Sequence, residues 1–168
     1  ENAVSERLRS QWFSKLGWVK RAAARSQAQF VATQFDVRGG GLDAPARSLS
    51  GGNMQKLILG RALLAPQGSK QGEKGAAPRF IVAHQPTWGL DIGAVRFVHQ
   101  QLLAARDAGA AVLLISDDLD EVLALGDRIG VMHEGHLSAA LPHAEWSRES
   151  IGLAMAGSGR SANTAAHA

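Results

Sequence analysis

A serine and two glycines before an apolar helix are the residues of this chain best suited to hold a phosphate group. Residues 48–56 read SLSGGNMQK, and a helix-like run, LILGRALL, follows directly. The first turn of a helix offers backbone N–H groups without partners inside the helix, together with about half a positive charge. Gly51 and Gly52 would let a phosphate approach the backbone closely, and Ser50 would add a hydroxyl. A plain turn in which Ser50 caps the helix explains the same residues.

Acidic residues and histidines elsewhere in the chain have structural explanations beside chemical ones. Asp118 and Glu121 stand three positions apart, which is typical of a helix start with Asp118 as the cap. Asp117 then fits the same helix end, where negative charge is favoured. His133 and His136 in the stretch HEGHL could chelate a metal ion, but a solvent-facing hairpin tip explains them equally.

The elements that must position these residues alternate between helices and apolar strands. We expect helices over 1–36, 51–65, 95–105 and 119–125, strands over 79–83 and 111–116, and a strand, turn and strand within 128–137. The runs RFIVA and AVLLIS are apolar throughout, which predicts buried strands. Apolar strands that alternate with helices favour an α/β fold with a parallel sheet. Residues 66–78 read as a flexible surface loop, and residues 157–168 as a disordered tail.

The composition fits one soluble domain and excludes several functional classes. The chain has 168 residues, 45% of them hydrophobic, with a net charge of +3 and no cysteine, which excludes disulfides and thiolate metal sites. No apolar run approaches the ~18 residues of a membrane span, and no signal peptide is visible, so the cytoplasm is the default compartment. Cations cluster near the N-terminus, at Arg7, Arg9, Lys15, Lys20, Arg21 and Arg25. This cluster could meet nucleic acid, anionic lipid or an acidic partner, or form a solvated helix face.

Taken in order, several of these stretches resemble the motifs of ABC-type ATPases. LSGGN at 49–53 is similar to the family's signature motif, and HQPTWGLD to its Walker B and D-loop region. ISDDLDE is placed like the switch region, and DRIGVMHEG resembles the terminal hairpin. The likeness covers roughly residues 20–145. The form GGNMQK looks most like importers of simple sugars and nucleosides, whose ATPase subunit carries two ATPase domains in tandem. The chain resembles the latter part of the second one.

The resemblance implies an incomplete P-loop NTPase fold of three layers with parallel core strands. Residues 1–48 would be part of the helical subdomain, and 49–145 the C-terminal part of the ATPase core, with 66–78 as an insertion. The phosphate loop G-x-x-x-x-G-K-[ST] does not occur in the sequence, so the Walker A half is missing. The chain also begins with Glu1 rather than Met. We therefore expect a fragment that hydrolyses no ATP by itself.

The positions that resemble the catalytic residues of the family are altered. His84 and Gln85 stand where the Walker B motif has Asp and Glu. Neutral His84 is a poor substitute for a carboxylate that orients Mg²⁺, and is equally an ordinary loop histidine. Gln85 can hold a water molecule but cannot accept its proton. Asp117 occupies the position of the switch histidine and would bring negative charge near a γ-phosphate. The resemblance thus implies a degenerate catalytic site even in the complete subunit.

The residues that the family offers to a partner's nucleotide are retained: Ser50, Gly51, Gly52 and Asn53 in the signature, and Asp91 in the D-loop. In this family two ATPase domains pair head to tail, so the chain would complete the ATP and Mg²⁺ site of the other domain. The implied partners are that first ATPase domain, the membrane permease and, indirectly, a solute-binding protein. The implied location is peripheral, on the cytoplasmic face of the plasma (inner) membrane.

Two alternatives come from other functional classes. The chain could be a non-enzymatic remnant or docking module that binds a partner ATPase or permease. It could also bind nucleic acid through its basic N-terminal stretch, in which case binding would depend steeply on salt. Base-reading motifs are absent from the sequence and aromatic residues make up only 5%, so we expect no nucleic acid partner.

Overall fold

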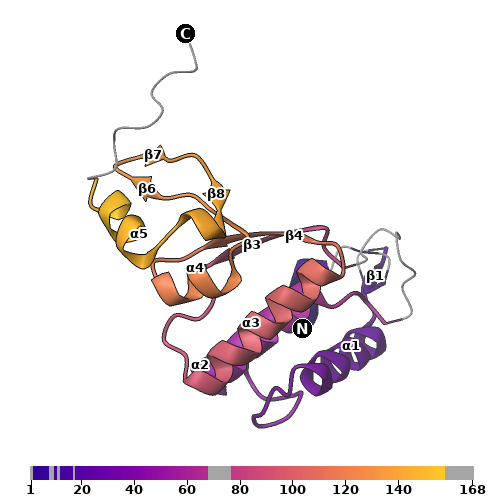
Figure 1. The fold of residues 1–168 in the computed structure, drawn as a ribbon. Helices are drawn as coiled ribbons and strands as arrows, with labels where there is room; N and C mark the ends of the chain where they lie inside the picture. Colours follow the sequence, from indigo (N-terminus) through magenta and orange to yellow (C-terminus); the bar gives the residue numbers. More distant parts are fainter. Residues whose placement is uncertain (1, 8–9, 11, 17, 68–76, 158–168) are drawn as a thin grey trace. The chain divides into compact units, whose positions relative to one another are not determined.

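The computed structural model describes residues 2–7, 10, 12–16, 18–67 and 77–157, which form two compact units (Figure 1). The first unit is Glu1–Leu113 and the second is Leu114–Ala168. Most of the loop expected at 66–78 and nearly all of the tail expected at 157–168 lie outside the described residues. Within the described ranges, no helix is both long enough and apolar enough to cross a membrane.

The first unit begins with short elements and not with the helix expected over 1–36. A 3-10 helix, η1 (Asn2–Arg7), is followed by the antiparallel strands β1 (Ser14–Lys15) and β2 (Trp18–Val19). Helix α1 starts only at Arg21 and runs to Gln34. The reason is burial, because Phe13 packs with Val4 and Ala24 in one cluster, which requires the chain to fold back before the helix starts. Tertiary packing here overrides local helix propensity.

Helix α1 packs against α2 (Gly51–Leu63), which follows the 3-10 turn η2 (Ala46–Ser48). The contact is close because Gly60 has no side chain, and a Cβ there would lie 2.7 Å from Cγ1 of Val31. Val31 and Phe35 of this contact are 0% and 2% exposed. The buried amide of Gln27 also joins α1 to the segment after α2, since it donates to the carbonyl of Ala65 and accepts from the backbone N–H of Gln67.

Strands β3 (Phe80–His84) and β4 (Ala111–Ile115) pair with each other and are connected by α3 (Ile92–Asp107). The backbone N–H of Ala111 donates to the carbonyl of Arg79 at 2.8 Å, so both strands start at the same end and run parallel. The expectation that both strands are buried is wrong for one face. Phe80, Val82 and Leu113 are 60%, 56% and 48% exposed, because no element of the described residues covers them.

The second unit contains α4 (Leu119–Leu125), four short strands, the 3-10 turn η3 (His143–Glu145) and α5 (Arg148–Met155). Among the described residues, β5 (Arg128–Ile129) pairs with β8 (Leu141–Pro142), and β6 (Met132–His133) with β7 (His136–Leu137). The strand, turn and strand predicted within 128–137 are confirmed. Ile129, Val131 and Ile151 form the core of this unit, and the indole N–H of Trp146 donates to the carbonyl of Ile129.

Candidate functional site

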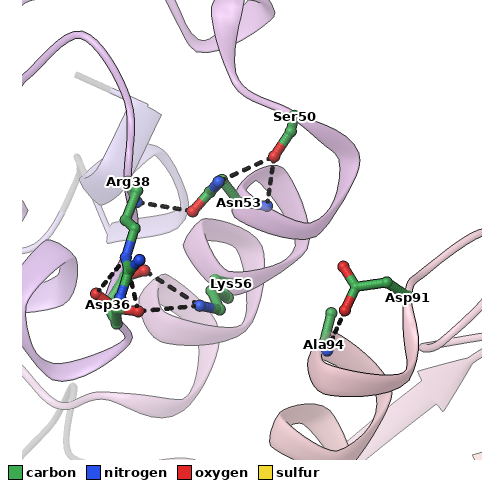
Figure 2. Close-up of polar contacts among 7 residues, drawn as sticks. All are labelled: Asp36, Arg38, Ser50, Asn53, Lys56, Asp91 and Ala94. Carbon is green, nitrogen blue, oxygen red and sulfur yellow. Dashed lines mark hydrogen bonds and ion pairs between the residues drawn. The ribbon is translucent and has the colours of Figure 1, made fainter.

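The first turn of α2 is organised by two polar side chains. Ser50 is the N-cap, and its hydroxyl oxygen accepts from the backbone N–H of Asn53 at 3.4 Å and from the side-chain amide of Asn53 at 2.9 Å (Figure 2). A serine hydroxyl has two acceptor lone pairs and one proton. Because both acceptor positions are used, the hydroxyl proton is what Ser50 can offer to a ligand. Ser50 therefore caps the helix and remains a potential donor at its exposed end.

The segment around Asp36 and Arg38, which precedes α2, is hydrogen-bonded to the first two turns of that helix. The amide oxygen of Asn53 accepts from the backbone N–H of Arg38 at 2.7 Å. One turn further, the ammonium of Lys56 donates to the carbonyl and carboxylate of Asp36, at 3.2 and 3.4 Å, and lies 5.2 Å from the ring centre of Phe97. A hydrogen bond from Arg38, and a weaker one from Lys56, lower the pKa of the Asp36 carboxyl (Figure 2). Sequence reasoning missed Arg38, because nothing local indicates a contact 15 positions away.

The N-termini of α2 and α3 lie beside each other. Asp91 is the N-cap of α3, where its carboxylate accepts from the backbone N–H of Ala94 at 3.0 Å (Figure 2). A Cβ at Gly52 would lie 3.5 Å from Cβ of Ala94 and 3.8 Å from Oδ2 of Asp91, whereas one at Gly51 would meet nothing within 4 Å. The structure thus brings Asp91 next to the signature residues. Glycine at position 52 permits the close approach, while position 51 faces open space.

The two helix ends differ in charge. The end of α3 is capped by the carboxylate of Asp91, which offsets the positive end of that helix dipole. The end of α2 is capped by the neutral hydroxyl of Ser50, and its first turn holds no acidic residue. The start of α2 therefore has no acidic residue of its own, although the carboxylate of Asp91 lies beside Gly52, and the exposed Gly51 leaves space for an anion on the side away from Asp91.

The residues at the end of β3 form a separate part of the site. His84 is exposed, and Gln85 has a φ of +47°, in the left-handed region that residues other than glycine seldom adopt. The next residue, Pro86, is buried, and its carbonyl accepts from the side-chain amide of Gln55 at 2.8 Å. Gln55 thus links α2 to the loop after β3. Sequence analysis did not single it out, and no local signal marks it.

Asp117 belongs to the second unit, which is described here by itself. Its side chain is exposed directly before Asp118, the N-cap of α4. Asp118 accepts from the backbone N–H groups of Asp120 and Glu121, as predicted for a capping residue. Within its unit, Asp117 therefore lies at a helix start that favours negative charge.

The histidines and carboxylates of the described residues do not gather into a metal-binding cluster. Among them, no group of three or more His, Cys, Asp or Glu side chains is placed to hold a metal. His133 and His136 face each other as cross-strand partners of β6 and β7, and a ring nitrogen of His133 lies 2.8 Å from the carbonyl of Met155. The chemistry that the site can perform is to hold an anion at the start of α2.

Comparison with known proteins identifies relatives of the chain and of its fold. Over 158 residues, 94% of this chain and 29% of the relative, the chain is 40% identical to the guanosine import ATP-binding protein NupO of Bacillus subtilis. It is 37% identical to the nucleoside import ATP-binding protein NupA of Lactococcus lactis, over 94% of this chain and 30% of that protein. The chain is a homologue of sugar and nucleoside import ATP-binding proteins. Another relative, the ribose import ATP-binding protein RbsA 2 of Streptomyces avermitilis, is 36% identical over 85% of this chain and 26% of its own length.

These relatives are longer ATPases, and the chain matches their C-terminal part, as the sequence analysis predicted. The chain spans less than a third of the length of NupO and of NupA. No protein-family model matches the chain.

Solved structures confirm the fold class. The ATP-binding cassette MJ0796, in a dimeric post-hydrolysis state bound to ADP and Pi, has a TM-score of 0.58 at 23% identity, covering 78% of this chain and 52% of that one. The ADP conformation of MJ1267, an ATP-binding cassette of an ABC transporter, has a TM-score of 0.56 at 24% identity, covering 83% and 49%. The chain therefore has part of the fold of an ABC ATPase cassette, a mixed α/β P-loop NTPase fold.

Proposed function

We propose that this chain is part of the ATP-binding subunit of an ABC importer for simple sugars or nucleosides, and that it completes the ATP site of a partner ATPase domain. The printed functions of NupO, NupA and RbsA 2 support the importer and the two solute classes. The solved dimer of MJ0796 with ADP and Pi supports a nucleotide site in a paired arrangement. ATP with Mg²⁺ would be the ligand of the complete subunit.

The observation that carries this proposal is the pairing of the two helix starts. Ser50 and Gly51 are exposed at the positive end of α2, and Asp91 lies beside Gly52 at the start of α3. In the proposed arrangement, the α2 end faces the terminal phosphate of the partner's nucleotide, with the hydroxyl proton of Ser50 as a donor. Asn53 holds that hydroxyl through two hydrogen bonds. Asp91 would contact the partner domain from the adjacent loop.

The chain's own hydrolytic site is proposed to be degenerate. Gln85 has no basic oxygen that could take a proton from an attacking water molecule. His84 offers an imidazole where the family's metal site has a carboxylate, and Asp117 would repel a γ-phosphate. The chain by itself is therefore proposed to hydrolyse no ATP, and the turnover of the subunit would come from the partner site.

The remaining parts of the complex follow from the importer assignment. The partners are the first ATPase domain of the same or a paired subunit, the membrane permease and, indirectly, a periplasmic or lipoprotein solute-binding protein. The subunit would lie peripherally on the cytoplasmic face of the plasma (inner) membrane. Residues 1–48 would belong to the helical subdomain and 49–145 to the ATPase core.

The test is steady-state ATP hydrolysis by the full-length protein that carries this sequence. Ser50→Arg should lower turnover at least about tenfold, because a bulky cation fills the space before α2 and removes the hydroxyl donor; a lost transition-state donor costs about this much or more. Ser147→Arg is the matched control. Ser147 caps α5 in the same way, accepting from the backbone N–H of Ser150, and lies outside the proposed site.

Gln85→Glu distinguishes ATP hydrolysis at this chain's own site from ATP hydrolysis at the partner's site. Restoring a carboxylate at this position alone should leave turnover nearly unchanged, because His84 and Asp117 still disfavour hydrolysis at this chain's own site. A large gain from this single substitution, or full activity of Ser50→Arg, would contradict the proposed division of labour.

One observation favours a second candidate, the non-enzymatic docking module. Phe80, Val82 and Leu113 are largely exposed on one face of the β3–β4 pair, and such a face is typical of a surface that another polypeptide covers. Weak binding of an ATP analogue combined with firm binding to a partner ATPase or permease would favour this candidate over the first.

A further inference from the structure

The side-chain amide of Asn53 has two ends, and each end bonds to a different residue. Its carbonyl oxygen accepts from the backbone N–H of Arg38 at 2.7 Å, and its NH2 group donates to the hydroxyl oxygen of Ser50 at 2.9 Å (Figure 2). All three residues lie in the first unit. Asn53 therefore connects the segment after α1 to the residue that caps α2.

The backbone N–H of Arg38 decides which end of the Asn53 amide faces Ser50. A backbone N–H can only donate, so it has to meet the carbonyl oxygen of the amide. The NH2 group is then left to face Ser50, where it uses one lone pair of the hydroxyl oxygen. The backbone N–H of Asn53 uses the other lone pair at 3.4 Å. Because both neighbours of the hydroxyl are donors, its own proton is directed away from them and toward a ligand.

Loss of the bond from Arg38 would allow the amide of Asn53 to turn over. The last side-chain torsion of asparagine is broad and roughly two-fold, so the reversed amide is accessible once nothing holds it. Its carbonyl oxygen would then face Ser50 and accept the hydroxyl proton. The hydroxyl would present a lone pair, and not a proton, to an approaching phosphate. The two orientations of one amide thus give the Ser50 hydroxyl opposite effects on an anion.

The segment that carries Arg38 is held to α2 by a second contact. The ammonium of Lys56 donates to the carbonyl and the carboxylate of Asp36, at 3.2 and 3.4 Å, and the Lys56 side chain is only 19% exposed. Residues 39–41, which follow Arg38 directly, are three glycines, and Gly41 has a φ of +85°. Glycines constrain the backbone little, so the contact with Lys56 is important for keeping the segment in place.

We propose that the segment 36–38 controls whether Ser50 can donate to the partner's nucleotide, with Asn53 and Lys56 as positioning residues. The proposal rests on the proposed function, because it concerns the regulation of the same site. While the segment is bound to α2, the NH2 group of Asn53 faces Ser50 and the hydroxyl proton is available to the γ-phosphate. When the segment is displaced, Asn53 turns over and takes up that proton. A movement at the end of α1 would thereby change the site without moving α2.

The test compares ATP hydrolysis by the full-length protein in two backgrounds, the parent and Ser50→Ala. Asn53→Asp has nearly the shape of the parent residue and still accepts from Arg38, but its second oxygen can only accept, so it captures the Ser50 proton. In the parent background it should lower kcat at least about tenfold with little change in KM, because the lost donor acts on charge that develops in the transition state. In the Ser50→Ala background the same substitution should lower kcat no more than about threefold, the effect of its negative charge alone.

Lys56→Met tests the second contact and leaves Ser50 and Asn53 in place. Methionine keeps an unbranched apolar chain at this position but removes the bonds to Asp36. The substitution should lower kcat roughly two- to fivefold in the parent background, the range for an exposed ion pair, and should have no effect on kcat in the Ser50→Ala background. Arg25→Met is the matched control. It removes an ion pair of the same unit that involves Asp43 instead of Asp36, so kcat should stay unchanged.

Hydrogen exchange of the Arg38 amide gives a readout that does not depend on activity. Exchange should become faster in Asn53→Ala and in Lys56→Met, but should stay slow in Asn53→Asp, which keeps the acceptor. Slow exchange in Asn53→Ala would overturn the proposal, and so would equal losses of kcat from Asn53→Asp in both backgrounds. In that second case the proposed function would stand, because Ser50 would act without Asn53. Unchanged turnover of Ser50→Ala would instead contradict the proposed function, and with it the control of Ser50 by the segment 36–38.

Discussion

Single residues in this chain act mainly by fixing the backbone around the start of α2. Asn53 bonds at once to the cap hydroxyl of Ser50 and to the backbone N–H of Arg38, so it couples the helix start to the segment that precedes it. Asp36 performs a similar task one turn further, because its carboxylate accepts from Arg38 and Lys56. These contacts link α2 to the segment after α1, which lies at some distance from it in the sequence.

The Asp36 contacts should make this region sensitive to acid. Hydrogen bonds from Arg38 and then Lys56 lower the pKa of the Asp36 carboxyl. The ionised form is thus favoured in the folded state, and its contribution is fully present above the unfolded pKa of about 3.8. It is lost as the pH falls through the lowered folded pKa. Asp36→Asn should therefore flatten the acid limb of a plot of unfolding stability against pH.

This effect should be small and sensitive to salt, because the ion pair of Asp36 with Arg38 is solvent-exposed. The measurement is denaturant unfolding of the parent and the variant at low and high ionic strength. The difference between the two acid limbs should shrink when salt is added. An acid limb that is identical in both proteins at low salt would show that Asp36 contributes nothing to folding stability.

At the scale of elements, the closest contact in the first unit is the crossing of α1 and α2 at Gly60. A Cβ at this position would lie 2.7 Å from Cγ1 of Val31 and 3.1 Å from the ring of Phe35, both of which are buried. Gly60→Ala should destabilise the protein by about 1–3 kcal/mol, because overpacking outweighs the higher helix propensity of alanine. Thermal unfolding of the full-length protein would measure the change.

Gly152→Ala provides the matched control. Gly152 lies inside α5, and a Cβ there would meet nothing within 4 Å. The same substitution should therefore stabilise the protein by about 0.5–1 kcal/mol through helix propensity alone. Equal effects at the two glycines would mean that the α1–α2 contact is looser than the structure describes.

Elements whose signals are local could be predicted from the sequence, and elements set by distant packing could not. The start of α2 follows from Ser50 and the start of α4 from Asp118, because a capping side chain acts within three residues. The hairpin of β6 and β7 follows from its glycine turn, where Glu134 and Gly135 have positive φ. The strands before α1 were missed, because the burial of Phe13 decides them.

The candidate site divides in the same way. Its residue types could be predicted, because the glycines and the serine stand next to one another in the sequence. The approach of Asp91 to Gly52 and the bond from Gln55 to Pro86 could not, because each joins segments that are more than thirty positions apart. Contacts of this kind form when α2 and α3 pack together, and a local sequence pattern cannot predict that packing.

For the whole molecule, the informative feature is the open face of the β3–β4 pair. Phe80, Val82 and Leu113 expose apolar side chains there, whereas Ala83 of the same strand is buried on the other face. The relatives NupO and NupA are more than three times as long as the matched region, so chain that is absent here has the length to cover this face. An uncovered strand pair is also prone to associate with other strands.

Replacing apolar residues of the open face should therefore improve the behaviour of the 168-residue chain and destabilise the full-length protein. In the 168-residue chain, Phe80→Thr with Leu113→Thr should reduce self-association, because threonine keeps the strand preference and removes apolar surface. In the full-length protein, where we expect further chain to cover the face, the same pair should lower the free energy of unfolding by about 2–5 kcal/mol per site, the cost of truncating a buried apolar side chain. Light scattering tests the first effect and denaturant unfolding the second. Unchanged stability of the full-length variant would mean that this face stays open in the complete molecule, and its apolar residues would then serve a separate partner, as the docking module requires.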